Sequence, residues 1–314
     1  MKLIGAFLRL VRWPNLVFIA LTQLLFYYCL QLPSFNVNGV VYPHKLSWPL
    51  FACISLSSIL IAAAGYVIND YFDLNIDRLN KPDKLIVDKL IRRRWAILWH
   101  LGLSAAGVLL GVWVGLKTGN HLIGPANLMC VALLWVYSTS LKKKMLIGNI
   151  LISLLTAWVV LVIWFCEIRI GKTYPGFTAV QTRIYKFGVL YASFAFIISL
   201  IREVVKDMED MYGDEKYGCR TMPIVWGINA SKLFIVTWMV VLTAAVLIIQ
   251  VYAFQLKWWW SSIYSILFIL VPLILLFRPL MAASQPEHFH KISSRIKLVM
   301  MTGILSMIFF SIYG

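Results

Sequence analysis

The stretch Asn69-Asp70-Tyr71-Phe72-Asp73-Leu74-Asn75-Ile76-Asp77 contains three aspartates with the spacing Asp-x-x-Asp-x-x-x-Asp. The same spacing returns in Lys206-Asp207-Met208-Glu209-Asp210-Met211-Tyr212-Gly213-Asp214. Positions i, i+3 and i+7 share one face of a helix, so each stretch predicts a stripe of three carboxylates. Both stripes follow long apolar runs, and aligned carboxylates beside a membrane repel one another unless a cation lies between them. The two stretches therefore predict helices that hold cations at the edge of a bilayer.

The composition around these stretches is that of an all-α, polytopic membrane protein. The chain has 314 residues, of which 61% are hydrophobic and only 13% are charged, and its mean hydropathy is +0.81. A soluble domain of this size carries far more charge. Apolar runs of spanning length predict about nine transmembrane helices, at 14–31, 48–69, 94–116, 123–140, 146–166, 186–205, 230–252, 258–277 and 296–313.

The placement of the basic residues predicts the orientation of the chain. With nine spans, the 29 lysines and arginines divide into 22 on the N-terminal side of the membrane and 7 on the other side. The positive-inside rule then places the N-terminus and both aspartate stretches in the cytoplasm. We expect an integral protein of the plasma (inner) membrane. The net charge of +16 is explained by topology and contact with membrane lipids, so no nucleic-acid partner is expected.

The aspartate motifs also indicate an internal duplication within one domain, 1–314. Laying Asp70 on Asp207 superimposes all three aspartates at an offset of 137 residues. Two pseudo-repeated halves, about 1–140 and 141–314, would turn their stripes toward a central cavity at the interface between repeats. The loops 71–94 and 206–229, which carry the motifs, are predicted to be ordered caps over this cavity.

Three glycines in the third predicted helix recur at every fourth position. They are Gly107, Gly111 and Gly115, and this small-xxx-small spacing is typical of closely packed membrane helices. We therefore predict a packing role for them.

The chemistry of the two motifs favours a magnesium-bound diphosphate. Magnesium takes one or two carboxylates and completes its shell with waters and substrate phosphates. Asn69 and Lys206 immediately precede the two motifs, Lys84 follows the first, and Arg202 lies one helical turn before Lys206. A diphosphate needs several such donors. The alternative roles are helix capping for single carboxylates and simple salt bridges for neighbouring cations.

Two helix ends add further polar candidates. The fourth predicted helix closes on Tyr137-Ser138-Thr139-Ser140-Leu141-Lys142-Lys143-Lys144, and Gly148-Asn149 opens the fifth. The first helix opens on Arg12-Trp13-Pro14-Asn15. Both stretches are also typical of interfacial anchoring, in which lysines reach toward headgroups and Tyr or Trp lies at the membrane boundary.

These residues together resemble the UbiA superfamily of intramembrane prenyltransferases. The nine helices, the two aspartate motifs, the Tyr137–Asn149 junction and the segment Gly218–Pro223 all match that family's pattern. The resemblance implies magnesium-dependent transfer of a polyprenyl group from a polyprenyl diphosphate to a lipophilic acceptor. It implies metal ligands at Asp70, Asp73, Asp77, Asp207, Asp210 and Asp214, and catalytic roles for Asp70, Asp73, Asp207, Asp210 and Lys142. Substrate binding is implied for Asn15, Asn69, Lys84, Tyr137, Arg202 and Lys206.

The acceptor is less closely indicated. The run Asn69–Asp83 looks most similar to the enzymes that prenylate geranylgeranylglyceryl phosphate, so an isoprenoid glycerol phosphate is the expected acceptor. The chain departs from that group where Lys84-Leu85-Ile86-Val87-Asp88-Lys89 replaces Arg-Pro-Ile-Pro-x-Gly. An aromatic acceptor of a quinone, chlorophyll or haem pathway is the alternative.

Two other classes of protein fit the sequence less well. An ion-coupled transporter would place its acids near the bilayer midplane, whereas these lie at helix ends on one side. A non-catalytic lipid-binding scaffold does not account for two complete aspartate triplets.

Overall fold

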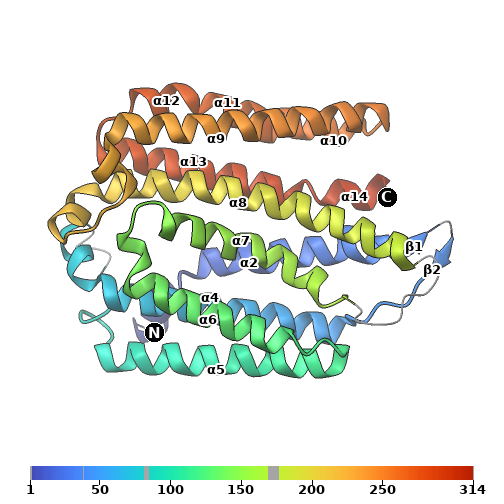
Figure 1. The fold of residues 1–314 in the computed structure, drawn as a ribbon, viewed down its shortest axis with the longest axis horizontal. Helices are drawn as coiled ribbons and strands as arrows, with labels where there is room; N and C mark the ends of the chain where they lie inside the picture. Colours follow the sequence, from blue (N-terminus) through green and yellow to red (C-terminus); the bar gives the residue numbers. More distant parts are fainter. Residues whose placement is uncertain (1, 38, 81–84, 169–176, 314) are drawn as a thin grey trace.

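The computed structural model describes residues 2–37, 39–80, 85–168 and 177–313. The helices run side by side along the long axis of the molecule (Figure 1). The N-terminal part contains the helices α1 (Lys2–Leu10), α2 (Trp13–Leu25), η1 (Phe26–Gln31, a π-helical turn), α3 (Leu32–Ser34), α4 (Trp48–Asn80), α5 (Arg93–Thr118) and α6 (Ile123–Thr139).

The second part begins with the 3-10 turn η3 and the helix α7. Its elements are η3 (Leu141–Lys143), α7 (Ile147–Phe165), α8 (Phe177–Lys216), α9 (Met222–Gln255), α10 (Trp259–Ser265), η4 (Ile266–Leu270), α11 (Val271–Leu275), α12 (Phe277–Ala282), α13 (Pro286–Leu305) and α14 (Ile308–Tyr313). Strands β1 (Asn36–Val37) and β2 (Val40–Val41) form a short antiparallel hairpin at the end of the molecule away from the N-terminus (Figure 1).

All nine predicted apolar runs are helical, which confirms the all-α polytopic fold. Within the described residues, eight helical spans are long and apolar enough to cross a membrane, and the shorter apolar helix Ile123–Thr139 lies at the ninth predicted position. Large apolar side chains such as Leu109, Leu233 and Leu275 are exposed on the outside of the bundle. Exposure of this kind is expected where the solvent is lipid.

The loops predicted at 71–94 and 206–229 begin later in the structure, because the helices that carry the motifs continue into them. Helix α4 runs to Asn80 and α8 to Lys216, so 71–80 and 206–216 are helical. Leu74 and Ile76 in α4 and Met208 in α8 are buried. Their apolar contacts extend each helix past the predicted apolar run, and this places each aspartate stripe on a continuous helix.

The prediction of close packing at the glycine ladder agrees with the contacts of α5. A Cβ atom added at Gly107 would lie 2.7 Å from Ile61, and one at Gly111 would lie 2.2 Å from Asn127. Helix α5 therefore approaches α4 and α6 more closely than any larger residue would allow. Helix α8 in turn packs against α7, α9 and α13.

Candidate active site

A cavity of about 1610 Å³ lies between the helices, and polar side chains from both motifs line it. Every predicted site residue within the described part of the chain faces this cavity, whereas Lys84 lies outside the described residues. The lining includes Asn15, Asn69, Asp70, Asp73, Asp77, Tyr137, Lys142, Arg202, Lys206, Asp207, Asp210 and Asp214. The two aspartate motifs, which lie far apart in the sequence, therefore line one cavity, as the sequence predicts.

The carboxylates of the first motif contact donors from elsewhere in the chain. The Arg12 Nη2 atom donates to Asp70 Oδ1 at 2.7 Å. Asn69 Nδ2 donates to Asp73 Oδ2 at 2.7 Å, as expected for positions i and i+4 of one helix. The second oxygen of Asp73 forms an ion pair with Lys142. Arg12, from the turn before α2, and Lys142, from the turn between α6 and α7, thus pair with the aspartates on α4.

A tight turn positions Lys142. It lies in the 3-10 turn η3, and a Cβ atom at Gly148 would come within 2.9 Å of the Lys142 Cα atom. Glycine at this position lets α7 pack directly against the turn. The Lys142 side chain is 10% exposed, whereas Lys143 and Lys144 are exposed. Lys142 therefore points into the protein, whereas Lys143 and Lys144 are accessible to lipid headgroups.

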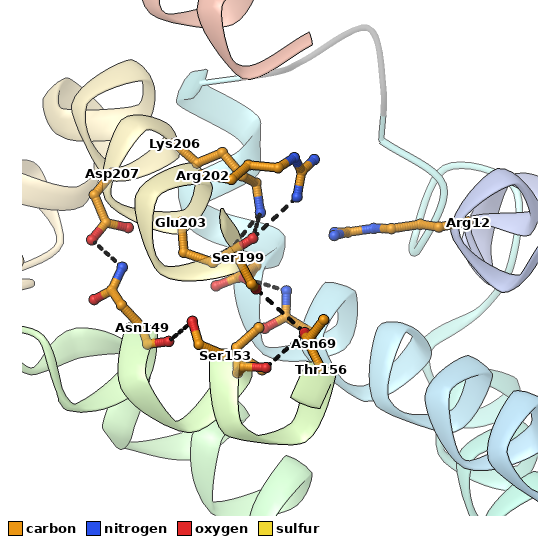
Figure 2. A network of polar contacts seen from close by, with 12 residues as sticks. Arg12, Asn69, Asn149, Ser153, Thr156, Ser199, Arg202, Glu203, Lys206 and Asp207 are labelled. Atoms are coloured by element: carbon orange, nitrogen blue, oxygen red, sulfur yellow. Dashed lines mark hydrogen bonds and ion pairs between the residues drawn. The ribbon is translucent and has the colours of Figure 1, made fainter. Parts of the chain in front are cut away.

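The second motif lies beside a compact polar network (Figure 2). Asn149 Nδ2 donates to Asp207 Oδ2 at 2.8 Å. Glu203 accepts hydrogen bonds from Arg202 Nη1 at 3.1 Å and from Lys206 Nζ at 3.0 Å. The Glu203 side chain is only 12% exposed, so it holds both cations at the cavity wall.

The oxygen atoms of the site fit a magnesium ion whose coordination shell is completed by phosphate and water. Among the described residues, no group of three or more His, Cys, Asp or Glu side chains is close enough to hold a metal by itself. Instead Asp70, Asp73 and Asp207 accept hydrogen bonds from nitrogen atoms of other side chains. The buried Oδ1 atom of Asn69 has no hydrogen-bond partner and lies in the cavity lining. Oxygen ligands in small number are what magnesium takes from a protein when phosphates supply the rest.

Arg12 is held in the site at a cost in backbone energy. Its φ of 52° and ψ of 53° lie in the left-handed region, which costs about 1–2 kcal/mol for a residue other than glycine. Partial burial alone would lower the pKa of the guanidinium, but Asp70 and Tyr66 raise its pKa above the ordinary value. Arg12 is therefore a constant positive charge beside Asp70.

Sequence reasoning did not assign Arg12, Glu203 or Lys297 to the site. Glu203 lies one helical turn before Asp207, and this spacing could have revealed it. The Arg12-Trp13-Pro14-Asn15 segment opens the first predicted helix, and only its Asn15 is predicted to bind substrate. Lys297 lies near the end of the chain, in a helix without a polar motif, and contacts Asn15. Only the tertiary structure brings it to the cavity.

The fold and the site define a class: a polytopic helical membrane protein with a cavity lined by two aspartate motifs and several cations. Residues 37–294 match the model of the UbiA prenyltransferase family. The chain belongs to the UbiA prenyltransferase family, as the resemblance predicted.

Two curated relatives match most of the chain. A digeranylgeranylglyceryl phosphate synthase of Methanospirillum hungatei is 32% identical, with 93% of this chain and 92% of the relative covered. A protein of the same name from Methanosphaera stadtmanae is 28% identical, with 80% and 84% covered.

Solved structures share the fold. A digeranylgeranylglyceryl phosphate synthase structure has a TM-score of 0.60 at 23% identity, with 98% of this chain and 99% of that chain covered. A UbiA homologue from Archaeoglobus fulgidus bound to DMAPP and Mg²⁺ has a TM-score of 0.58 at 14% identity, with 96% and 98% covered.

Proposed function

We propose that this enzyme transfers a polyprenyl group from a prenyl diphosphate to the hydroxyl of an isoprenoid glycerol phosphate. The observation that carries the proposal is the convergence of both aspartate motifs on one cavity together with Lys142 and Arg202. The names of the curated relatives support the same reaction. The homologue bound to DMAPP and Mg²⁺ supports a diphosphate as the donor's leaving group.

The aspartates hold the donor through magnesium in this proposal. The residues that would hold the metal are Asp70, Asp73, Asp77, Asp207, Asp210 and Asp214, and the side-chain Oδ1 atom of Asn69 would add a neutral oxygen. When bound there, magnesium would supply positive charge to offset the negative charge that develops on the diphosphate. Lys142, oriented by Asp73 and the η3 turn, faces the same leaving group and supplies a further positive charge.

The bonds rearrange at the first carbon of the prenyl group. The C1–O bond to the diphosphate breaks, and its electron pair leaves with the diphosphate, so that an allylic cation forms. The acceptor hydroxyl attacks this carbon and forms the new C–O bond, and the hydroxyl proton passes to the departing diphosphate. Hydrogen-bond donors and cations that are already in position stabilise the negative charge on the departing diphosphate without having to reorganise during the reaction.

The apolar part of the cavity protects the cation from water. Its lining includes Trp158, Phe187, Leu190, Phe194 and Met300. These side chains accommodate the prenyl tail, and exclusion of water from such a site prevents hydrolysis of a reactive intermediate.

We also infer the placement of the enzyme in the cell. The excess of lysine and arginine on the N-terminal side favours a plasma-membrane protein whose N-terminus and active site face the cytoplasm. The equal spacing of the two motifs supports an origin by duplication of halves near 1–140 and 141–314 within a single domain.

A competition assay tests the proposal. Purified full-length protein is incubated with geranylgeranyl diphosphate, Mg²⁺ and equal concentrations of geranylgeranylglyceryl phosphate, 4-hydroxybenzoate and a naphthoate. We expect the glycerol phosphate to be labelled first and EDTA to abolish turnover. Exclusive labelling of an aromatic ring would assign the alternative acceptor class. Failure to release diphosphate with any acceptor would contradict prenyl transfer itself.

A further inference from the structure

Lys297 from α13 brings a fourth positive charge to one wall of the cavity. Its Nζ atom donates to Asn15 Oδ1 at 2.7 Å and lies 5.3 Å from the centre of the Phe18 ring. The charged groups that act on it are Arg202, Lys206 and Arg12. These four residues, here called the cation cluster, all line the cavity and come from α8, α13 and the turn before α2.

The charges within the cation cluster are only partly neutralised by protein carboxylates. Asp70 pairs with Arg12, and Glu203 pairs with both Arg202 and Lys206. In the described part of the chain, Lys297 makes no ion pair with an aspartate or glutamate. The ion pairs of the cation cluster therefore use two carboxylates for four cations, and Asp77 and Asp207 also act on Arg12 and Lys206. Lys297 is the member of the cluster with which a phosphate monoester, whose charge is about −1.5 to −2 at pH 7, would pair.

An unused hydrogen-bond donor at the same wall supports an anionic ligand. The Arg202 Nε atom is buried and has no hydrogen-bond partner. A buried donor left without an acceptor is unfavourable, and a phosphate oxygen would satisfy it. Figure 2 shows Arg12 reaching from the other side toward the Arg202–Glu203 pair, so that the guanidinium groups approach the same region.

We propose that the cation cluster binds the phosphate of the acceptor and that Lys297 makes the enzyme require a phosphorylated acceptor. The inference rests on the proposed function. The same phosphate chemistry could instead come from the terminal phosphate of the donor. Both Lys142 and the cluster member Arg12 pair with aspartates of the first motif, whereas Lys297 donates its hydrogen bond to Asn15 on α2. This contact favours the acceptor as the partner of Lys297.

The decisive variant is Lys297→Met, which keeps an unbranched apolar stem against Phe18 and removes the charge. Steady-state kinetics are measured with geranylgeranyl diphosphate and with geranylgeranylglyceryl phosphate or its unphosphorylated alcohol. We expect the KM for the phosphorylated acceptor to rise about tenfold or more, because a charge-assisted hydrogen bond is lost. The donor KM should stay within about twofold of the wild-type value, and the preference for the phosphorylated acceptor should fall.

Matched variants separate this role from a structural one. Lys297→Arg should restore most of the acceptor preference because it restores the charge. Lys291→Met is the control, since Lys291 lies on the same helix but is exposed and outside the cavity lining; it should leave both KM values unchanged. If Lys297→Met does not fold, Lys297→Gln and Asn15→Ala test the same contact and should raise the acceptor KM.

Each remaining result overturns the inference. A rise in donor KM alone would assign the cation cluster to the diphosphate. Unchanged KM values in a folded Lys297 variant would show that this lysine binds neither substrate, while the wild-type transfer reaction would still support the proposed function. If the wild-type enzyme does not use the glycerol phosphate at all, both proposals fail together.

Discussion

The side-chain amide of Asn80 makes two hydrogen bonds to the backbone of the second aspartate motif, one of them with Gly213. The Gly213 N–H donates to Asn80 Oδ1 at 2.9 Å, and Asn80 Nδ2 donates to the carbonyl oxygen of Asp210 at 3.0 Å. Asn80 is the last residue of α4, which carries the first motif. One side chain therefore sets the separation between the two aspartate stripes.

Gly213→Ala should uncouple the two motifs. A Cβ atom at position 213 would lie 2.3 Å from Asn80 Oδ1, so the amide must move and both hydrogen bonds weaken. We expect turnover to fall about tenfold or more, since small misplacements of reacting groups are costly, with little change in membrane insertion. Gly102→Ala is the control, because nothing lies within 4 Å of a Cβ atom there. Equal activity of the two variants would contradict this coupling.

Asp70→Ala and Asp207→Ala should each reduce turnover by about 100-fold or more, because removing one charge-stabilising group from a preorganised site typically costs that much. Each variant should still fold, since the apolar packing of α4 and α8 remains. Diphosphate release is the measurement. Glu215→Ala, an exposed acid next to the second motif, should retain activity. Near-normal rates in both aspartate variants would rule out their role as metal ligands.

The three consecutive lysines after α6 should differ in their effects. Lys142→Ala removes the partner of Asp73 and a positive charge near the leaving group, so kcat/KM for the donor should fall about tenfold or more. Lys143→Ala and Lys144→Ala should change it less than about twofold, because these side chains are exposed. Kinetics with varied donor concentration distinguish the cases. Three equally small effects would instead support interfacial anchoring for the whole run.

Glu167→Ala should lower stability without a direct effect on the aspartate site. Glu167 is 2% exposed and accepts hydrogen bonds from the backbone N–H groups of Lys45 at 3.0 Å and Leu46 at 2.8 Å. Each buried donor left unsatisfied costs about 1–3 kcal/mol. Thermal unfolding in detergent should therefore begin at a lower temperature, while the donor KM of the folded protein stays unchanged. The exposed Glu287→Ala is the matched control, and an unchanged melting temperature for Glu167→Ala would refute this role.

The sequence by itself determined the membrane-spanning helices and the two aspartate stripes. Both depend on local regularities: an apolar run long enough to cross a bilayer, and a spacing that places Asp70, Asp73 and Asp77 on one face of a helix. It also distinguished Lys142 from its neighbours, although only through resemblance to a family. The helix ends were less well predicted, because the burial of Leu74 and Met208 in tertiary contacts extends α4 and α8 beyond their apolar runs.

Only the tertiary structure decided which distant side chains complete the cavity. Asn15 and Lys297 are 282 positions apart and meet through the packing of α2 against α13. Arg12, whose backbone is in the left-handed conformation, pairs with Asp70 on another helix. Asn80 at the end of α4 bonds to Gly213 near the end of α8. The periodicity and composition of the sequence do not predict these contacts. Each contact depends on how separate helices pack and not on neighbouring residues in the chain.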